Sequence, residues 1–211
     1  MTHLPSWLRQ HLAALRALLI FTVVLGIVYP VAIWGIAQGV FPHQANGSMV
    51  KFHGRVVGSS LLCQEWVDAK GNPLAQYFQS RPSSATLSTV KNDPGCDPLN
   101  SSASNLGPNN PVLVTTIKQR QQAIAAFDHV PVSAIPPDAV TASASGLDMG
   151  ISPANAAIQV DRVATARHIN PAAVQALVRQ NTFGRQLGFL GEPYVNVLLL
   201  NIALDSKYPV P

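Results

Sequence analysis

The pattern of apolar and polar positions divides this chain into one charge-free apolar run and a longer polar remainder. No Asp, Glu, Lys or Arg lies between Arg16 and Lys51, and residues 17–41 are almost wholly apolar. At ~1.5 Å per residue, a helix of about 25 residues spans roughly 37 Å, more than the ~30 Å hydrocarbon core of a bilayer. We therefore predict a short N-terminal segment, residues 1–16, followed by a transmembrane helix over residues 17–41.

A cleaved signal peptide is the alternative interpretation of this run. Signal peptides have an apolar core of ~7–15 residues, whereas about 18 residues of the run precede Gly35-Ile36-Ala37, the segment that resembles a cleavage site. An uncleaved anchor is therefore favoured. Because long segments after a first span are translocated largely regardless of charge, we expect a cytoplasmic N-terminus and an extracytoplasmic domain over residues 42–211. Pro30 lies within the run and predicts a bend or an unpaired backbone carbonyl.

Residues 42–211 show the patterns of both strands and helices, which predicts one α/β (α+β) extramembrane domain. Short β-branched pieces between glycines indicate strands and turns over residues 42–62. Residues 68–111 form a long irregular segment that is rich in Pro, Gly, Asn and Ser. Its apolar residues, among them Tyr77 and Phe78, favour a folded surface over disorder.

Helical patterns dominate the rest of the domain. Apolar residues at positions 113, 117, 124 and 127 predict a helix over residues 112–128. Ser152-Pro153 and Asn170-Pro171 each combine a capping side chain with a proline at the first helical position, and so predict two further helix starts.

The pattern also predicts which residues these later elements bury. The helix over residues 153–168 is expected to place one face in the core, with Ala157, Val160 and Ala164 on it. The helix that starts at Pro171 is expected to end near Arg179. Residues 194–204 are apolar enough for either a core strand or a core helix, and the periodicity does not distinguish the two.

Charge and cysteine content narrow the classes of partner. The domain carries 12 of the 14 Lys and Arg, since only Arg9 and Arg16 precede it, and all 10 Asp and Glu, a net charge of +2. No basic cluster with interleaved aromatic residues occurs, which argues against a nucleic-acid partner and leaves the lipid bilayer as the expected one.

The chain has two cysteines, and the sequence leaves their state open. Cys63 and Cys96 either form a disulfide in an oxidising compartment or remain separate thiols.

Patterns for catalysis or ligand binding are sparse. Ser88 and Lys91 match the Ser-x-x-Lys pattern of serine acyl-enzymes, but the accompanying Ser-Asp-Asn and Lys-Thr-Gly motifs are absent. An anchored extracytoplasmic serine hydrolase is therefore the alternative function, and the sequence disfavours it. The histidines lack metal-ligand spacing and no phosphate-binding glycine loop occurs, so we expect this chain to bind neither a metal nor a cofactor.

Several ordered motifs nevertheless carry a resemblance that runs from the anchor almost to the end of the chain. These are Asn46-Gly47-Ser48, Tyr77-Phe78, Arg81-Pro82-Ser83, Ser104-Asn105-Leu106-Gly107-Pro108, residues 140–148 with the helix through Gln159, Arg162-Val163-Ala164, and residues 191–205. With these motifs the chain resembles the C subunits of bacterial Kdp potassium-transporting P-type ATPases.

The resemblance implies a non-catalytic accessory subunit, a single-pass protein of the bacterial inner membrane with an α/β domain. It implies two partners: an ion-conducting, channel-like subunit and a catalytic subunit that uses ATP to transport potassium. The implied roles are stabilising the complex and raising the ATP affinity of the catalytic subunit. We further expect the domain to cap the ion entrance through residues 77–108. The residues that it suggests for contacts with partner subunits are Tyr77, Phe78, Arg81, Pro82, Asn105, Leu106, Gly107 and Asp148.

The ATP-related role implied by the resemblance rests partly on a helix glutamine that corresponds to Gln159. A domain outside the membrane has no access to cytoplasmic ATP. If the predicted orientation holds, any nucleotide effect is indirect, and we expect Gln159 to be a packing or interface residue.

Overall fold

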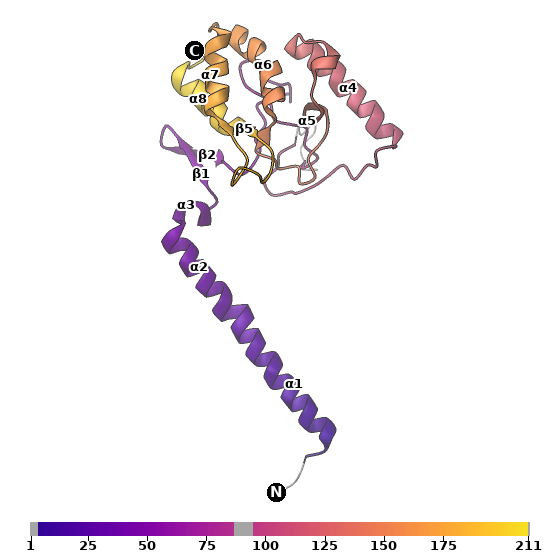
Figure 1. The fold of residues 1–211 in the computed structure, drawn as a ribbon, viewed down its shortest axis with the longest axis vertical. Helices are drawn as coiled ribbons and strands as arrows, with labels where there is room; N and C mark the ends of the chain where they lie inside the picture. The colour runs from indigo at the N-terminus through magenta and orange to yellow at the C-terminus, as the bar shows by residue number, and fades with distance from the viewer. Residues whose placement is uncertain (1–3, 87–94, 211) are drawn as a thin grey trace. The chain divides into compact units, whose positions relative to one another are not determined.

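The computed structural model describes residues 4–86 and 95–210. The chain divides into two compact units, Met1–Met49 and Val50–Pro211, which we describe separately (Figure 1). Ser88 and Lys91, the residues of the hydrolase alternative, lie outside the described residues.

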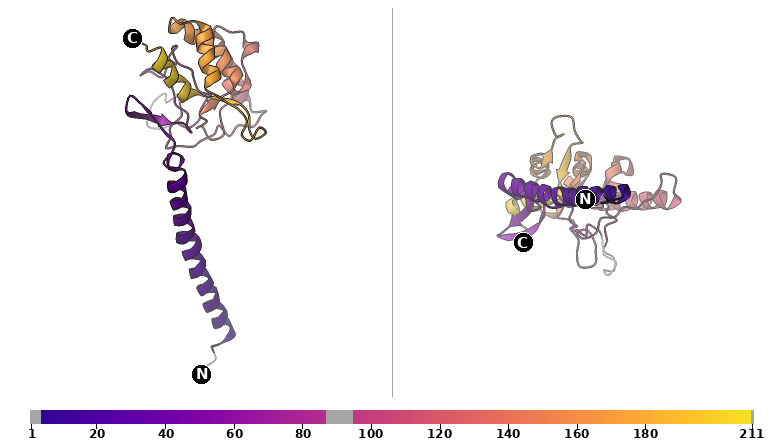
Figure 2. Two further views of the ribbon diagram at one scale, coloured as in Figure 1. Left: turned by 60° about the vertical axis from the view of Figure 1, so that its left-hand side comes forward. Right: turned by 90° about the horizontal axis from the view of Figure 1, so that it is seen from below.

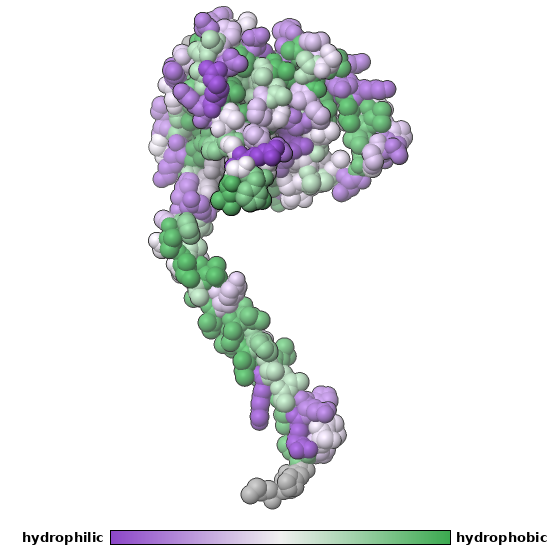
Figure 3. Space-filling view, in the orientation of Figure 1, coloured by the Kyte–Doolittle hydropathy of each residue, from purple (hydrophilic) through white to green (hydrophobic). Residues whose placement is uncertain are grey.

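The first unit is one long apolar helix followed by a short one. The long helix comprises α1 (Ser6–Val23), a π-helical turn (Val24–Val28) and α2 (Tyr29–Val40). Apolar side chains cover most of its surface, and none of its residues is buried (Figure 3). By length and composition the helix from Ser6 to Val40 is able to cross a membrane. It begins about three turns before the predicted start at residue 17. The short helix α3 (Pro42–Ala45) follows it.

The π-helical turn lies directly before Pro30. Proline has no N–H, so an α-helix would leave the carbonyl four residues earlier without its donor. Within the π turn the N–H of Tyr29 donates to the carbonyl of Val24, five residues earlier. The predicted disturbance at Pro30 is therefore a local widening of the helix, which is a recognised way of accommodating such a residue.

The second unit contains two small sheets. Strands β1 (Met49–Phe52) and β2 (Arg55–Ser59) form a two-stranded sheet, which confirms strands within residues 42–62. A three-stranded antiparallel sheet has the order β3-β5-β4, with Gly150 opposite Asn196 and Thr182 opposite Val195. Its strands are β3 (Gly150–Ile151), β4 (Thr182–Phe183) and β5 (Tyr194–Asn196).

Helices α6 and α8 pack against β5 of the three-stranded sheet (Figure 2). Helix α6 packs on α7, α7 on α8, and α4 on α6. The bounds are α4 (Pro111–Asp128), α5 (Pro137–Val140), α6 (Pro153–Ala166), α7 (Pro171–Gln180) and α8 (Val197–Lys207), with a 3-10 turn over Val132–Ala134. The main core lies between α6, α7, α8 and β5, and a smaller cluster around Ile135 and Val140 packs against α4.

The predicted helix starts are confirmed by their caps. The side chain of Ser152 accepts a hydrogen bond from the N–H of Asn155, and that of Asn170 accepts one from Ala172. The predicted buried face of α6 is wrong at Ala157, which is exposed, whereas Ala156 is fully buried. The face is displaced because α6 also buries polar side chains, which an apolar pattern does not reveal.

Residues 194–204 adopt both of the conformations that their sequence allows. The strand β5 ends at Asn196, whose side chain accepts a hydrogen bond from the N–H of Leu199 and so caps α8. The cap explains why one apolar run changes from strand to helix without an intervening turn.

Candidate functional site

Residues 75–82 cross the domain in an irregular, non-helical conformation and contain several of the predicted contact residues. Phe78 and Asn201 are both fully buried. The N–H of Phe78 donates to Asn201 Oδ1, and Asn201 Nδ2 donates to the carbonyl of Phe78, both at 2.9 Å. Asn201 thus forms the pair of hydrogen bonds that a neighbouring strand would form. The side chain of Phe78 lies in the core and presents no surface to a partner.

Gln159 forms an equivalent pair of hydrogen bonds with the backbone of the next residue, Gln79. Its Oε1 accepts from the N–H of Gln79 at 2.8 Å, and its Nε2 donates to the carbonyl of Gln79 at 3.2 Å and to Asn155 Oδ1 at 3.0 Å. Both ends of the Gln159 amide are therefore bonded within the domain, and the residue is buried. Because a buried backbone group without a partner is unfavourable, Gln159 and Asn201 hold residues 78–79 in place.

Arg162, in α6, connects that helix to α4 and to the irregular segment. Its Nε donates to Asp128 Oδ1 at 2.6 Å, and its Nη1 donates to the carbonyls of Ala75 and Tyr77 at 2.6 and 2.9 Å. The guanidinium also lies 4.4 Å from the centre of the Phe127 ring. Burial raises the pKa of Asp128 and lowers the pKa of Arg162, and the attraction between the two opposes both shifts.

A second arginine, Arg167, holds the neighbouring part of the segment. Its Nε donates to the carbonyl of Gln76 at 2.7 Å, and its Nη2 donates to Asp205 Oδ1 at 2.8 Å. The hydroxyl of Tyr77 donates to the other oxygen of Asp205 at 3.2 Å, and burial raises the pKa of Tyr77. Tyr77 is therefore half-buried and bonded within the domain.

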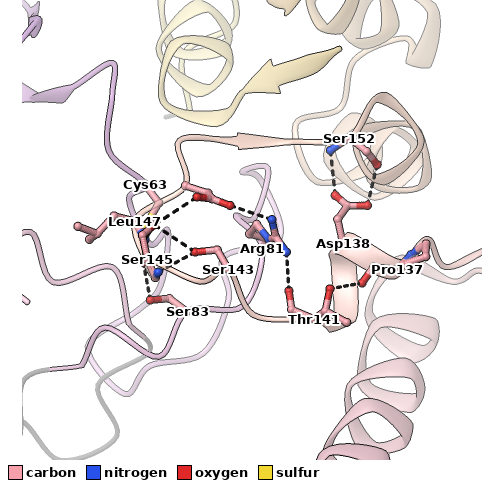
Figure 4. A network of polar contacts seen from close by, with 12 residues as sticks. Cys63, Arg81, Ser83, Pro137, Asp138, Thr141, Ser143, Ser145, Leu147 and Ser152 are labelled. Atoms are coloured by element: carbon pink, nitrogen blue, oxygen red, sulfur yellow. Dashed lines mark hydrogen bonds and ion pairs between the residues drawn. The ribbon is translucent and has the colours of Figure 1, made fainter. Parts of the chain in front are cut away.

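The serine-rich loop over residues 141–148 meets this segment at Arg81 (Figure 4). Arg81 Nη1 donates to Asp148 Oδ2 at 2.8 Å, and Nη2 donates to the carbonyl of Thr141 at 3.2 Å. The structure thus brings together two of the predicted contact residues that are far apart in the sequence. Their side chains remain 24% and 41% exposed, so the ion pair is accessible from outside the domain.

Gly146 lies close to Ala85 and Ser102 of the irregular segment over residues 68–111. Ser83 Oγ donates to the carbonyl of Gly146 at 2.7 Å and accepts from the N–H of Cys96 at 3.0 Å. A Cβ on Gly146 would lie 2.7 Å from the Cβ of Ala85 and from the carbonyl oxygen of Ser102, and its φ of +74° favours glycine. Only glycine fits here.

Cys63 and Cys96 form a disulfide, with their Cα atoms 5.6 Å apart. The bond therefore closes the loop that contains residues 75–82, and of the two states that the sequence left open, a disulfide or separate thiols, the structure has the disulfide.

The remaining predicted contact residues lie nearer the surface. Asn105 and Gly107 are exposed, and Pro82 and Leu106 are half-buried.

A cavity of about 440 Å³ lies beside Gln159, between α4, α6 and the irregular segment. Its lining is largely apolar, with Ile124 and Phe127 of α4 on one side. The charged residues that line it are Glu65 and Asp128, and among the described residues no Lys or Arg lines it. Among residues 4–86 and 95–210, no three His, Cys, Asp or Glu side chains gather in a way that suits a metal ion.

Local sequence patterns did not identify Asn201, Arg162 or Arg167 as the residues that hold the irregular segment. Arg162 and Asn201 are polar residues within helices that otherwise pack on the core, and Arg167 directly follows α6. That contrast is the signal available from the sequence. Their partners within residues 75–78 lie 85 to 123 residues away along the chain, which local patterns cannot reveal.

These features define a class: one apolar helix able to cross a membrane, followed by a mixed α/β domain whose buried polar side chains hold its own backbone. The family model described as K+-transporting ATPase, c chain (KdpC), matches residues 11–206. The chain belongs to the KdpC family.

Curated relatives agree with this assignment. The chain is 49% identical over 193 residues to a potassium-transporting ATPase KdpC subunit of Dechloromonas aromatica, covering 92% of this chain and 95% of the relative. It is 46% identical over 206 residues to the corresponding subunit of Kineococcus radiotolerans, covering 98% of both chains.

Proposed function

We propose that this chain is a non-catalytic accessory subunit that stabilises a high-affinity, ATP-driven potassium pump. The family membership supports a role in potassium transport. The non-catalytic role is supported by the hydrogen bonds that the buried polar side chains form. Gln159, Arg162 and Asn201 all bond to the backbone of residues 75–79, so they position the chain's own surface.

The apolar helix supports a role in assembly. Its side chains are exposed along its whole length, so in a membrane they contact either lipid or another helix. In the proposed complex this helix packs against the ion-conducting subunit. The catalytic subunit uses ATP, and potassium is the transported ion.

Deleting residues 1–41 is expected to abolish co-purification of the chain with the ion-conducting subunit and to reduce potassium-stimulated ATPase activity. The matched control replaces residues 17–41 by an unrelated apolar span of equal length, which keeps the domain tethered but changes the helix surface. Unchanged activity and co-purification after the deletion would remove the anchoring role.

The disulfide supports an extracytoplasmic domain, because such bonds persist in oxidising compartments and are rare in the cytosol. In a bacterial inner membrane this orientation places the N-terminus in the cytoplasm. The domain then has no access to cytoplasmic ATP, and its effect on the catalytic subunit is indirect.

Thiol labelling of intact cells tests the orientation. The two native cysteines are bonded to each other, so Leu99→Cys introduces a single free thiol at a residue that is 92% exposed. A membrane-impermeant maleimide is expected to label Leu99→Cys in intact cells and to label Trp7→Cys only after the cells are permeabilised. The reverse pattern would place the domain in the cytoplasm.

A further inference from the structure

The loop between β4 and β5 carries a group of apolar side chains that the domain does not cover. Leu187 is 83% exposed, Phe189 68% and Leu190 47%. We call these three residues the apolar tip. The loop extends from the body of the domain at residues 184–193 (Figure 2). Large exposed apolar groups are unfavourable in water and commonly mark an interaction site.

The loop is held in one conformation although its side chains point into solvent. The N–H of Gln186 donates to the carbonyl of Leu190, and the N–H of Leu190 donates back to Gln186, both at 2.9 Å. At its base, Arg185 Nη2 donates to both carboxylate oxygens of Glu192, at 2.9 and 2.7 Å. The ordering is therefore local to the loop and independent of the core.

The conformation at the tip is itself unfavourable. Leu187 has a φ of +52° and is followed by Gly188 with a φ of +83°. Left-handed backbone is common for glycine but unfavourable for leucine, and such residues cluster at binding sites. The loop therefore holds Leu187 in an unfavourable backbone conformation and exposes its side chain as well. Contacts with the described part of the domain cover little of the Leu187 side chain, which is 83% exposed.

A protein hollow fits this geometry better than a lipid surface. Lipid is fluid and adapts to any apolar side chain, so a preorganised backbone brings little gain in lipid binding. A hollow of fixed shape does reward preorganisation, because less freedom is lost on binding. The paired charges of Arg185 and Glu192 also leave the loop without the net positive charge that attracts anionic lipid headgroups.

The tether restricts which protein the tip can meet. The membrane-spanning helix ends at Val40 and the domain begins at Val50. Even fully extended, this connection of about nine residues reaches only roughly 30 Å. If the helix spans a membrane, this length keeps the start of the domain, Val50, within reach of the outer faces of neighbouring membrane subunits.

We propose that the apolar tip inserts into an apolar hollow, rimmed by polar groups, on the extracytoplasmic face of the ion-conducting subunit. This inference rests on the proposed function, and adds a contact made by the domain itself to the contact made by the helix. It places the contact on residues 187–190, outside the segments over residues 77–108 and 140–148.

Site-specific photo-crosslinking tests the contact in the purified full complex. The photoreactive residue p-benzoylphenylalanine is placed at position 189 and, as a matched control, at position 99, where Leu99 is also an exposed apolar residue. Position 189 is expected to cross-link to the ion-conducting polypeptide, identified by mass, and position 99 is not. Cross-links from position 189 to lipid alone, or to nothing, would overturn the proposal.

Substitution gives an independent readout. Phe189→Ser is expected to weaken the association of the chain with the complex by about 10- to 30-fold, as for a central apolar contact. Leu99→Ser is expected to leave the association unchanged. Both variants should keep the thermal unfolding midpoint of the domain, because both side chains are exposed. Equal association of the two variants would overturn the proposal.

The two proposals fail in different ways. If the unmodified chain does not co-purify with the ion-conducting subunit, the proposed function fails. If the unmodified chain co-purifies but position 189 gives no protein cross-link, only the docking of the apolar tip fails.

Discussion

Asp128→Ala is expected to destabilise the domain by about 3–5 kcal/mol, because it leaves the Arg162 guanidinium buried without its carboxylate partner. The side chains of Arg162 and Asp128 are only 4% and 5% exposed. Arg162 also donates to the carbonyls of Ala75 and Tyr77, so its displacement would release the irregular segment. Urea unfolding of the full chain in detergent, with Trp7 and Trp34 replaced by Phe so that the fluorescence of Trp66 is followed alone, measures the change. Trp66 reports on this region because its ring lies 4.4 Å from that of Tyr77.

Two further variants make the interpretation of Asp128→Ala specific. Asp161→Ala removes an exposed acid on the same helix as Arg162 and is expected to change the unfolding free energy by less than about 0.5 kcal/mol. The double variant Asp128→Leu with Arg162→Met removes both charges and should recover part of the loss, since no unpaired charge remains. A loss below about 1 kcal/mol for Asp128→Ala would contradict the role of the pair.

Replacing both cysteines, Cys63→Ser with Cys96→Ser, is expected to reduce the unfolding free energy by about 3–4 kcal/mol. The disulfide closes a loop with a sequence separation of 33, and the unfolded chain gains freedom when this loop opens. Residues 75–82 lie inside the loop, and they have side-chain partners in place of a continuous sheet.

Reductant provides the control for the cysteine variant. The unmodified chain should lose the same stability when reductant is added, whereas the variant should not respond to it. A variant as stable as the oxidised chain would show that the side-chain bonds alone hold the irregular segment.

The sequence predicted those parts of the fold that local physics determines. The absence of charge over residues 17–41 predicted the apolar helix, and Ser152-Pro153 and Asn170-Pro171 predicted two helix starts that the structure confirms. Each signal lies within a few residues of the structure that it predicts. The resemblance of the ordered motifs to KdpC subunits is likewise confirmed by the family match over residues 11–206.

Long-range contacts explain what the sequence did not reveal. The partners of Asn201 and Gln159 lie 123 and 80 residues away, so a periodic pattern records these side chains only as polar exceptions on apolar faces. The same effect displaced the predicted face of α6 from Ala157 to Ala156. The apolar tip was missed because an exposed leucine in a short loop has no periodicity at all.

The amide side chains of Asn201 and Gln159 have one further consequence. An extended backbone with open N–H and C=O groups is a template on which another chain can add a strand, and this is a common route to aggregation. At Phe78 and Gln79 both backbone groups are already bonded to side chains of their own domain. The stretch is thereby protected against unwanted strand addition while the subunits of a membrane complex, themselves newly synthesised, find one another.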